Sequence, residues 1–299
     1  SSFHPLSSEG RKMDTIVKDL KLIENTQKEN IENVSEIVAG IDVNDISSVI
    51  VPINEARVKT PGKKGPKGPK PAVILFSSIG GITILERYIA YYLARKGIST
   101  IVTQIEGIEE IEKIEDISPY FLSSLFSSVN ILDFASKHPD IDENKIATIG
   151  ISLGGFRSLY LSAMDMRIKS ATLIVSGLSV AETLATSDLK LVQEIRIKQM
   201  KNLKLDPMNK NDQKTYEEIL HQNMMFDVKE LLCRRSSTEF LLFQSRKDKI
   251  VPYKQQKALF KALGKPKRKV RNHFGHVGTA VMFGMTGIDD ATDFIKENL

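Results

Sequence analysis

Cysteine and long apolar runs are both scarce in this chain of 299 residues, and each shortage excludes a class of protein. The single cysteine, Cys233, excludes an internal disulfide framework and any metal cluster held by several thiolates. No helix start or histidine stands beside Cys233 to activate its thiol, so we interpret it as a small core residue. No apolar run approaches the roughly 20 residues that a membrane-spanning helix needs, and we expect no transmembrane segment.

The start of the chain does not reveal where the protein resides. A positively charged stretch followed by an apolar one would mark a secretory signal, and none is visible. The first residue is Ser1 rather than methionine, which is compatible with removal of a leader. We expect a soluble protein, located in the cytoplasm or exported to the periplasm after its leader is removed, and the sequence leaves this choice open.

Positive charge is in modest excess, at +5, and much of it lies in two segments, 57–70 and 265–271. Basic segments can bind nucleic acid or anionic lipid. The first segment is rich in glycine and proline, which is typical of a flexible loop. The second reads as the start of a strand. We therefore expect both segments to be solvated and expect no nucleic-acid partner.

Short apolar runs alternate with amphipathic segments along most of the chain. A continuous apolar run such as 72–76 is typical of a strand that is buried on both faces of a parallel sheet. Alternation of strands and helices predicts a doubly wound parallel sheet with helices on both faces. The predicted strands are 48–53, 72–76, 99–103, 146–149, 171–175, 239–243 and 268–271.

Two stretches depart from this alternation. Residues 1–45 are polar and helix-prone, with Ile16, Leu20 and Ile23 on one face, and they predict an N-terminal helical extension. Residues 180–230 contain no strand pattern and predict a helical insertion, or cap, over the C-terminal edge of the sheet. The sequence thus predicts an extension, 1–45, and a main domain, 46–299, that includes the cap.

The pattern Gly-x-Ser-x-Gly occurs at residues 150–154, with Ser152 at its centre. A buried strand leads into it and an amphipathic helix leads out, which is the setting of a nucleophile elbow. At so sharp a turn, side chains two residues before and after the serine would collide, and Gly150 and Gly154 remove that collision. The pattern predicts Ser152 as a nucleophile and the backbone N–H of Leu153 as an oxyanion donor.

A serine hydroxyl needs a base within hydrogen-bond reach, and the base needs an orienting partner. Asp248 follows the predicted strand 239–243, on the loop where sites on such sheets gather. Two histidines follow the last predicted strand, His273 and His276. We favour His276 because the neighbouring glycines suit a loop that brings an imidazole into the site, and we keep His273 as the alternative.

The oxyanion hole needs a second backbone donor, and the turn after strand 72–76 is suited to supply it. We favour the N–H of Ile79, with Gly80 next. A further unusual feature is that isoleucine recurs at every third position from Ile105 to Ile117. This segment is either a collar at the entrance of the site or, as we favour, a short amphipathic helix with one solvated face.

These segments together resemble the α/β-hydrolase superfamily, near its dienelactone-hydrolase and acyl-peptidase-like branches. The resemblance implies an α/β-hydrolase fold with a mostly parallel, eight-stranded sheet, and a triad of Ser152, Asp248 and His276. It also implies an oxyanion hole formed by Leu153 and Ile79. Many relatives have His-Gly where this chain has Ser77 and Ser78. The matching segments are 72–81, 141–146, 150–155, 248–252 and 275–276.

The resulting functional hypothesis is a serine hydrolase that acts on a small acyl substrate through an acyl-enzyme. We favour a carboxylic ester over a thioester or amide because the insertion is small, and a peptidase stays open. The alternatives are a non-catalytic binding protein with this fold and an acyltransferase with the same triad. We find no metal-ligand spacing and no nucleotide-binding fingerprint, and we expect no cofactor or metal. The sequence does not indicate the oligomeric state.

Overall fold

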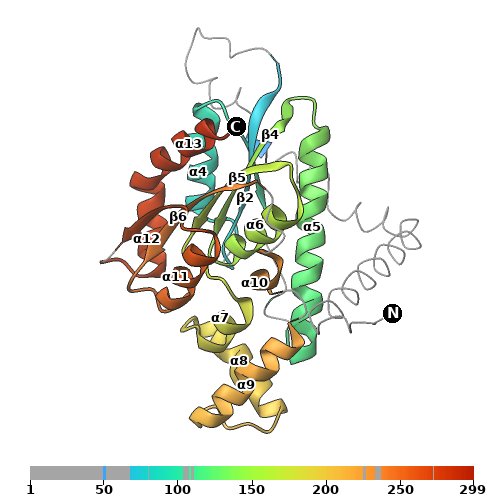
Figure 1. Ribbon diagram of the computed structural model, residues 1–299, viewed down its shortest axis with the longest axis vertical. Helices are drawn as coiled ribbons and strands as arrows, with labels where there is room; N and C mark the ends of the chain where they lie inside the picture. Colours follow the sequence, from blue (N-terminus) through green and yellow to red (C-terminus); the bar gives the residue numbers. More distant parts are fainter. Residues whose placement is uncertain are drawn as a thin grey trace, which may run out of the picture. The chain divides into compact units, whose positions relative to one another are not determined.

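The computed structural model describes residues 50–51, 68–79, 81–103, 108, 111–224, 227–232, 237–271 and 273–299 (Figure 1). The predicted N-terminal extension, Cys233, Gly80 and most of the basic segment 57–70 lie outside the described residues. The domain boundary at residue 45 therefore stays a prediction.

The described strands form one sheet in the order β1-β3-β2-β4-β5-β6-β7. β1 pairs antiparallel with β3, and the other strands pair parallel. The predicted parallel sheet is confirmed, with seven strands among the described residues where the resemblance implies eight. The strands are β1 (Ile50–Val51), β2 (Lys70–Phe76), β3 (Ser99–Thr103), β4 (Ile141–Ile151), β5 (Ile168–Ile174), β6 (Glu239–Ser245) and β7 (Lys267–Arg271).

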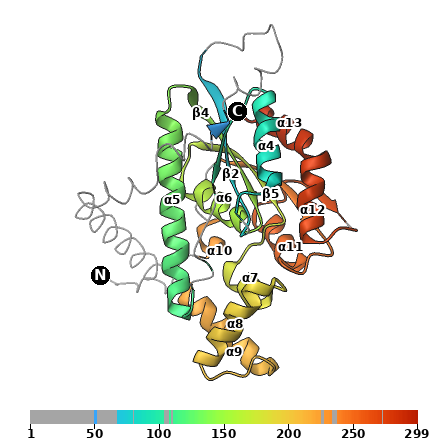
Figure 2. The same cartoon turned by 180° about the vertical axis from the view of Figure 1, so that it is seen from behind.

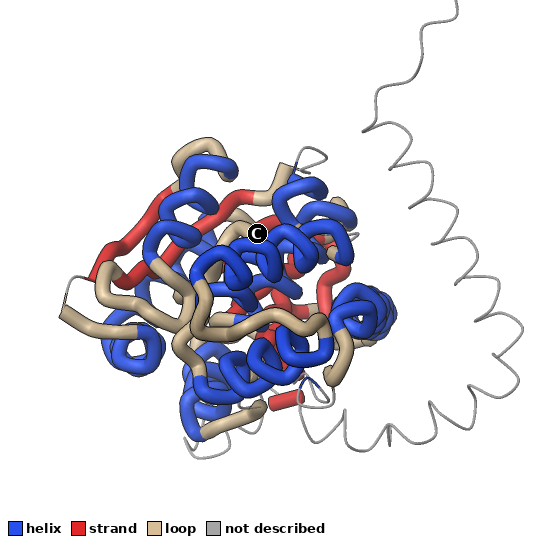
Figure 3. Tube along the Cα trace, turned by 90° about the horizontal axis from the view of Figure 1, so that it is seen from below, coloured by secondary structure: helices blue, strands red, loops and turns tan. Residues whose placement is uncertain are grey.

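Helices cover both faces of this sheet, as the alternating pattern predicts (Figure 3). α5 packs against α6, and α6 packs against β4 and β5. α4 lies with α12 and α13 on the opposite side of the strands (Figures 1 and 2), and the hydroxyl of Tyr92 on α4 donates to Asp289 on α13. These helices are α4 (Ile84–Arg95), α5 (Ile117–Lys137), α6 (Leu153–Met164), α11 (Tyr253–Ala262), α12 (His276–Met282) and α13 (Ile288–Glu297), with a π-helical turn, η4 (Phe283–Gly287), between the last two.

Local sequence signals account for the ends of α4. The side chain of Thr83 accepts from the N–H of Leu85, and Glu86 accepts from the N–H of Thr83, which completes the predicted capping box. The helix ends at Arg95, two residues before Gly97, whose φ of 87° suits a residue without a side chain. This helix follows directly on the turn at Ile79, so its capping fixes the end of that turn.

The centre of the sheet is the most deeply buried part of the described chain. Residues 72–76 of β2 are 0% exposed, and they lie between β3 and β4. The apolar run therefore forms a strand covered on both faces, as predicted. Burial of such a strand holds its carboxyl end in place, and the nucleophile elbow lies beside that end.

Between β5 and β6 the described residues form helices and no strand. We refer to residues 180–223 as the α7–α9 segment, which lies beyond one end of the strands in Figure 1. α8 confirms the amphipathic helix expected from Leu189, Val192 and Ile195, because Val192 and Ile195 are buried on it. The helices are α7 (Val180–Thr186), α8 (Lys190–Asn202), α9 (Lys210–Asn223) and, after two residues outside the described set, α10 (Val228–Leu231).

One buried carboxylate joins the two ends of the α7–α9 segment. Asp227, just before α10, accepts hydrogen bonds from the hydroxyl of Ser179 and, at 3.1 Å, from the N–H of Val180 at the start of α7. Burial raises the pKa of Asp227, while the hydrogen bonds from Ser179 and Val180 and the charge of His221 act in the opposite direction. The structure thus keeps a carboxylate in a place that favours its protonated form.

This raised pKa predicts how stability depends on pH. The folded chain retains the Asp227 proton to a higher pH than the unfolded chain does. Protonation of Asp227 therefore contributes fully to the stability of the fold below the unfolded pKa of 3.8, and this contribution is lost as pH rises through the folded pKa. Asp227→Asn removes this titration. Relative to the wild type, the variant should gain stability between pH 4 and pH 7 in urea-unfolding measurements.

The matched control for this measurement is Asp188→Asn, which removes an exposed carboxylate that follows α7. Any general effect of one lost charge on the unfolding free energy appears in both variants and can be subtracted. A stability difference between Asp227→Asn and the wild type that stays constant from pH 4 to pH 7 would contradict the raised pKa.

Candidate active site

Ser152 occupies a strained turn between β4 and α6. Its φ of 56° and ψ of −114° lie outside the regions that non-glycine residues favour. Its N–H donates to Ile174 O on β5 at 2.9 Å, and its carbonyl accepts from the N–H of Gly155, also at 2.9 Å. These two hydrogen bonds hold Ser152 in its strained conformation. Such a strained serine is what the sequence pattern predicts for a nucleophile elbow.

Close backbone contacts explain why glycines surround Ser152. A Cβ on Gly150 would lie 2.5 Å from Gly154 O, and a Cβ on Gly154 would lie 2.2 Å from Phe76 O. A Cβ on Gly155 would lie 1.6 Å from the side-chain oxygen of Ser176. The predicted collision within the turn is present at Gly150, whereas the contact at Gly154 comes from the end of β2. The third requirement, at Gly155, arises from Ser176 on a different segment and has no local sequence signal.

Asp248 and His276 are brought together at the ends of two different elements. The His276 Nδ1 lies 2.8 Å from Asp248 Oδ2, and since a carboxylate only accepts, Nδ1–H is the donor. His276 is the first residue of α12, and its side chain is 11% exposed. In the neutral ring, a hydrogen on Nδ1 leaves Nε2 without one, so that Nε2 can accept a proton. His273 is exposed.

The Asp248 carboxylate is held by further donors on both of its oxygens. Oδ1 accepts from the N–H groups of Ile250 and Val251, each at 2.9 Å, and Oδ2 also accepts from Gln256 Nε2 at 2.8 Å. Gln256 lies on α11, is fully buried, and its Oε1 in turn accepts from the N–H of Ser245. Gln256 is a positioning residue that sequence reasoning missed. Its only sequence signal is a polar residue on the buried face of a helix.

A cavity of about 40 Å³ lies at Ser152. Ile79 and Leu153, the two predicted oxyanion donors, line it together with Ile250 and Val251. The last two are the residues whose N–H groups bind Asp248, so the aspartate loop borders the same cavity as Ser152. Within the described part of the chain, no hydrogen bond joins Ser152 to His276. Such bonds often form only when substrate is present.

A buried arginine on α6 links the helix that follows Ser152 to α5 and β3. Arg157, one turn after Ser152 on α6, is 2% exposed and lies over the ring of Phe76 at 4.7 Å. Its guanidinium donates to Ser128 Oγ on α5 and to Thr103 Oγ1 on β3, each at 3.1 Å. Burial lowers the pKa of Arg157 to about 10. This residue ties α6 to its neighbours, and the sequence analysis did not single it out.

Comparison with known families decides the family membership. The family model for the prolyl oligopeptidase family matches residues 128–299, which is more than half of the chain. The chain belongs to the prolyl oligopeptidase family. This prolyl oligopeptidase family match includes Ser152, Asp248 and His276, whereas Ile79 lies before it. The resemblance to the α/β-hydrolase superfamily is thereby confirmed, and the chain belongs with the serine hydrolases.

Solved structures with the same fold include esterases and a peptidase. The acetyl xylan esterase from Paenibacillus sp. R4 is 18% identical, with a TM-score of 0.59 over 80% of this chain and 78% of that one. Acetyl xylan esterase 1 from Thermoanaerobacterium sp. JW/SL YS485 is 19% identical, with a TM-score of 0.53 over 76% and 77%. The Pyrococcus horikoshii acylaminoacyl peptidase is 16% identical, with a TM-score of 0.57 over 79% of this chain and 38% of that one. No curated protein matches the sequence.

Two features are absent from the described residues of this prolyl oligopeptidase family member. None of their helices is both long and apolar enough to cross a membrane. Their histidine, cysteine and acidic side chains form no group of three or more that could hold a metal ion.

Proposed function

We propose that the protein is a serine hydrolase that cleaves a carboxylic ester through an acyl-enzyme on Ser152. The observation that carries this proposal is the Asp248–His276 hydrogen bond of 2.8 Å, together with a strained Ser152 whose cavity is shared with Ile250 and Val251 of the aspartate loop. Family membership supports the same assignment, because the match includes all three residues.

The reaction begins when His276 Nε2 takes the proton from the hydroxyl of Ser152. The resulting alkoxide attacks the ester carbonyl, and the N–H groups of Leu153 and Ile79 stabilise the negative oxygen that forms. His276 then gives its proton to the leaving alcohol, and the acyl-enzyme remains. Water releases the acyl group in a second cycle in which His276 again acts as base. Asp248 orients the imidazole and stabilises its protonated form throughout.

An ester is favoured over a peptide by the size and lining of the site. The cavity at Ser152 has a volume of only about 40 Å³ and is bordered by the α7–α9 segment, which we propose to be the cap. The enclosed part of this site therefore suits a small acyl group better than the side chains that flank a scissile peptide bond. Two of the solved structures with this fold are acetyl xylan esterases, which are esterases by name.

Covalent labelling with a fluorophosphonate, followed by intact mass spectrometry, tests the proposal. The wild type should gain the mass of one phosphonyl group, and Ser152→Ala should gain none, because only an activated serine attacks the phosphorus. Ser187→Ala is the control, since Ser187 is another hydroxyl that lines the cavity, and this variant should still be labelled. Absence of labelling in the wild type would instead favour a non-catalytic binding protein.

A further inference from the structure

The cavity at Ser152 is apolar on most of its surface. Among the described residues that line it, the polar groups are the hydroxyls of Ser152, Thr183 and Ser187, and no side chain is charged. The rest of the lining is aliphatic or aromatic. A charged acyl group would lose its hydration there without gaining a partner, which is strongly unfavourable. The lining therefore selects for an uncharged acyl group.

The volume of the cavity limits how long that acyl group can be. A water-sized probe needs roughly 10–15 Å³ of such space. The 40 Å³ at Ser152 therefore accommodates about three atoms of the size of a methylene group. Helices α7 and α8 form one wall of this space, since Leu184 and Val192 line it.

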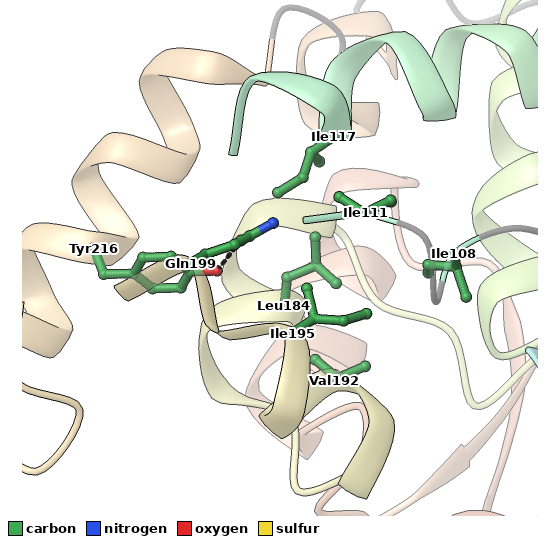
Figure 4. A pocket seen from close by; sticks show the side chains of 8 residues that line it. All are labelled: Ile108, Ile111, Ile117, Leu184, Val192, Ile195, Gln199 and Tyr216. Carbon is green, nitrogen blue, oxygen red and sulfur yellow. Dashed lines mark hydrogen bonds between the residues drawn. The ribbon is translucent and has the colours of Figure 1, made fainter. Parts of the chain in front are cut away.

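A second, smaller cavity of about 10 Å³ lies against the same wall (Figure 4). Ile108, Leu184 and Val192 line both cavities, so these three side chains form a partition between them. The second cavity is also aliphatic near the partition. Its other end is formed by Gln199 and Tyr216, which Figure 4 shows pointing toward one another.

The polar end of the second cavity is already satisfied by protein contacts. The hydroxyl of Tyr216 donates to Gln199 Oε1 at 2.6 Å, and Gln199 Nε2 donates to Lys113 O at 3.2 Å. Because these groups bind each other, the end of the cavity does not require a polar ligand. An aliphatic chain that passed the partition would meet aliphatic walls and would stop at this pair.

We propose that the substrate carries a short, uncharged, aliphatic acyl group, of about two to four carbons, and that Leu184 and Val192 set this length by closing off the second cavity. The proposal rests on the proposed function, because it assigns the acyl position of that same site. Leu184 contributes more than Val192 to this separation, since its side chain is the longer of the two and lies near the centre of Figure 4.

The test compares p-nitrophenyl acetate, butyrate, hexanoate and octanoate as substrates of the wild type and of Leu184→Ala. The wild type should prefer acetate and butyrate. In Leu184→Ala the two cavities join, and each methylene that gains a place should raise kcat/KM about fourfold. The ratio of kcat/KM for hexanoate to that for acetate should then rise at least about tenfold, on the basis of two methylenes.

Two further variants serve as a weaker opening of the partition and as a control. Val192→Ala opens the same partition less widely, so it should shift the ratio in the same direction by a smaller factor, and it serves if Leu184→Ala does not fold. Met200→Ala is the control, because Met200 is 1% exposed on the same helix as Val192 but lines neither cavity. Its hexanoate-to-acetate ratio should equal that of the wild type.

Fluorophosphonate labelling in parallel separates the two ways in which the idea can fail. If Ser152 is labelled but the wild type prefers octanoate, or both partition variants retain the wild-type ratio, the acyl-length proposal is overturned and the proposed function stands. If the wild type is neither labelled nor active on any ester of the series, the proposed function fails, and the acyl-length proposal falls with it.

Discussion

Asp248→Asn is expected to lower kcat on p-nitrophenyl acetate by about 10⁴-fold, by analogy with the loss of the orienting acid in other serine hydrolases. The asparagine oxygen will face Ile250 and Val251, because their two N–H groups donate to Oδ1. The amide NH2 then takes the place of Oδ2, where His276 Nδ1 and Gln256 Nε2 both donate. The asparagine NH2, a donor, would therefore face two other donors, His276 Nδ1–H and Gln256 Nε2–H.

The imidazole escapes this conflict by changing tautomer. When Nδ1 of His276 accepts from the asparagine NH2, its hydrogen moves to Nε2, which can then no longer take the proton of Ser152. The variant should be folded yet nearly inactive, and its thermal unfolding is measured beside its kinetics. Asp188→Asn is the matched control, because the backbone N–H of Asp188 bonds to Lys249 O beside Asp248. Retention of a tenth of wild-type kcat by Asp248→Asn would contradict the proposed role of Asp248.

The sequence predicts those parts of the fold in which several consecutive residues are apolar and buried. β2 is such a case, because an apolar run can only be accommodated between two other strands and two layers of helices. β4 is longer than predicted, since it begins at Ile141 rather than Ile146. Its first part includes the exposed residues 143–145, so it carries no apolar pattern, and its pairing with Lys70 is visible only in three dimensions.

α6 shows a second kind of difference. The sequence predicts its start at Phe156, whereas the helix begins at Leu153, directly after Ser152. Two glycines in the first turn have low intrinsic helix propensity and hide this start. Contacts with the ends of β2 and β5 set the start of the helix instead, because only glycine fits at Gly154 and Gly155. Tertiary packing thus overrides local preference at the elbow.

The isoleucine repeat illustrates the limit of interpreting a pattern without its surroundings. We favour a short helix with one solvated face, and the burial is as that predicts, since Ile108, Ile111, Ile114 and Ile117 are buried and residues 112, 113, 115 and 116 are exposed. Residues 111–113 are not helical, however, and Ile105 lies outside the described residues. Ile108 lines the cavity at Ser152, which favours the alternative of a collar at the site. A period of three matches the 3₁₀ turn found at residues 114–116.

The candidate triad was accessible from the sequence, but the groups that support it were not. Ser152, Asp248 and His276 follow the ends of β4, β6 and β7, and parallel strands bring those ends to one edge of the sheet. Gln256 contacts Asp248 in the preceding loop, and Arg157 contacts Ser128 and Thr103 on other elements. The sequence around a buried polar residue on a helix does not indicate which residue it will contact.

Gly154→Ala is expected to lower the free energy of unfolding by about 3 kcal/mol or more, because the added methyl group overlaps backbone. The Cβ would lie 2.2 Å from Phe76 O and 2.5 Å from Ser77 O, and neither carbonyl can rotate away as a side chain could. Either α6 or the end of β2 must move. Because Leu153 begins α6 and Ile79 lies on the turn that follows β2, kcat/KM should also fall by about 100-fold, as for a displacement of about 1 Å.

Gly97→Ala separates this steric effect from the general effect of adding a methyl group to a glycine. Gly97 has a φ of 87°, and no atom lies within 4 Å of a Cβ placed there. Its replacement should lower the free energy of unfolding by only about 1–2 kcal/mol, through backbone strain, and should leave kcat/KM unchanged. Urea unfolding and ester kinetics on both variants make the comparison. If Gly154→Ala is no less stable than Gly97→Ala, then α6 does not approach β2 as closely as the structure shows, and the geometry of the oxyanion hole is set in some other way.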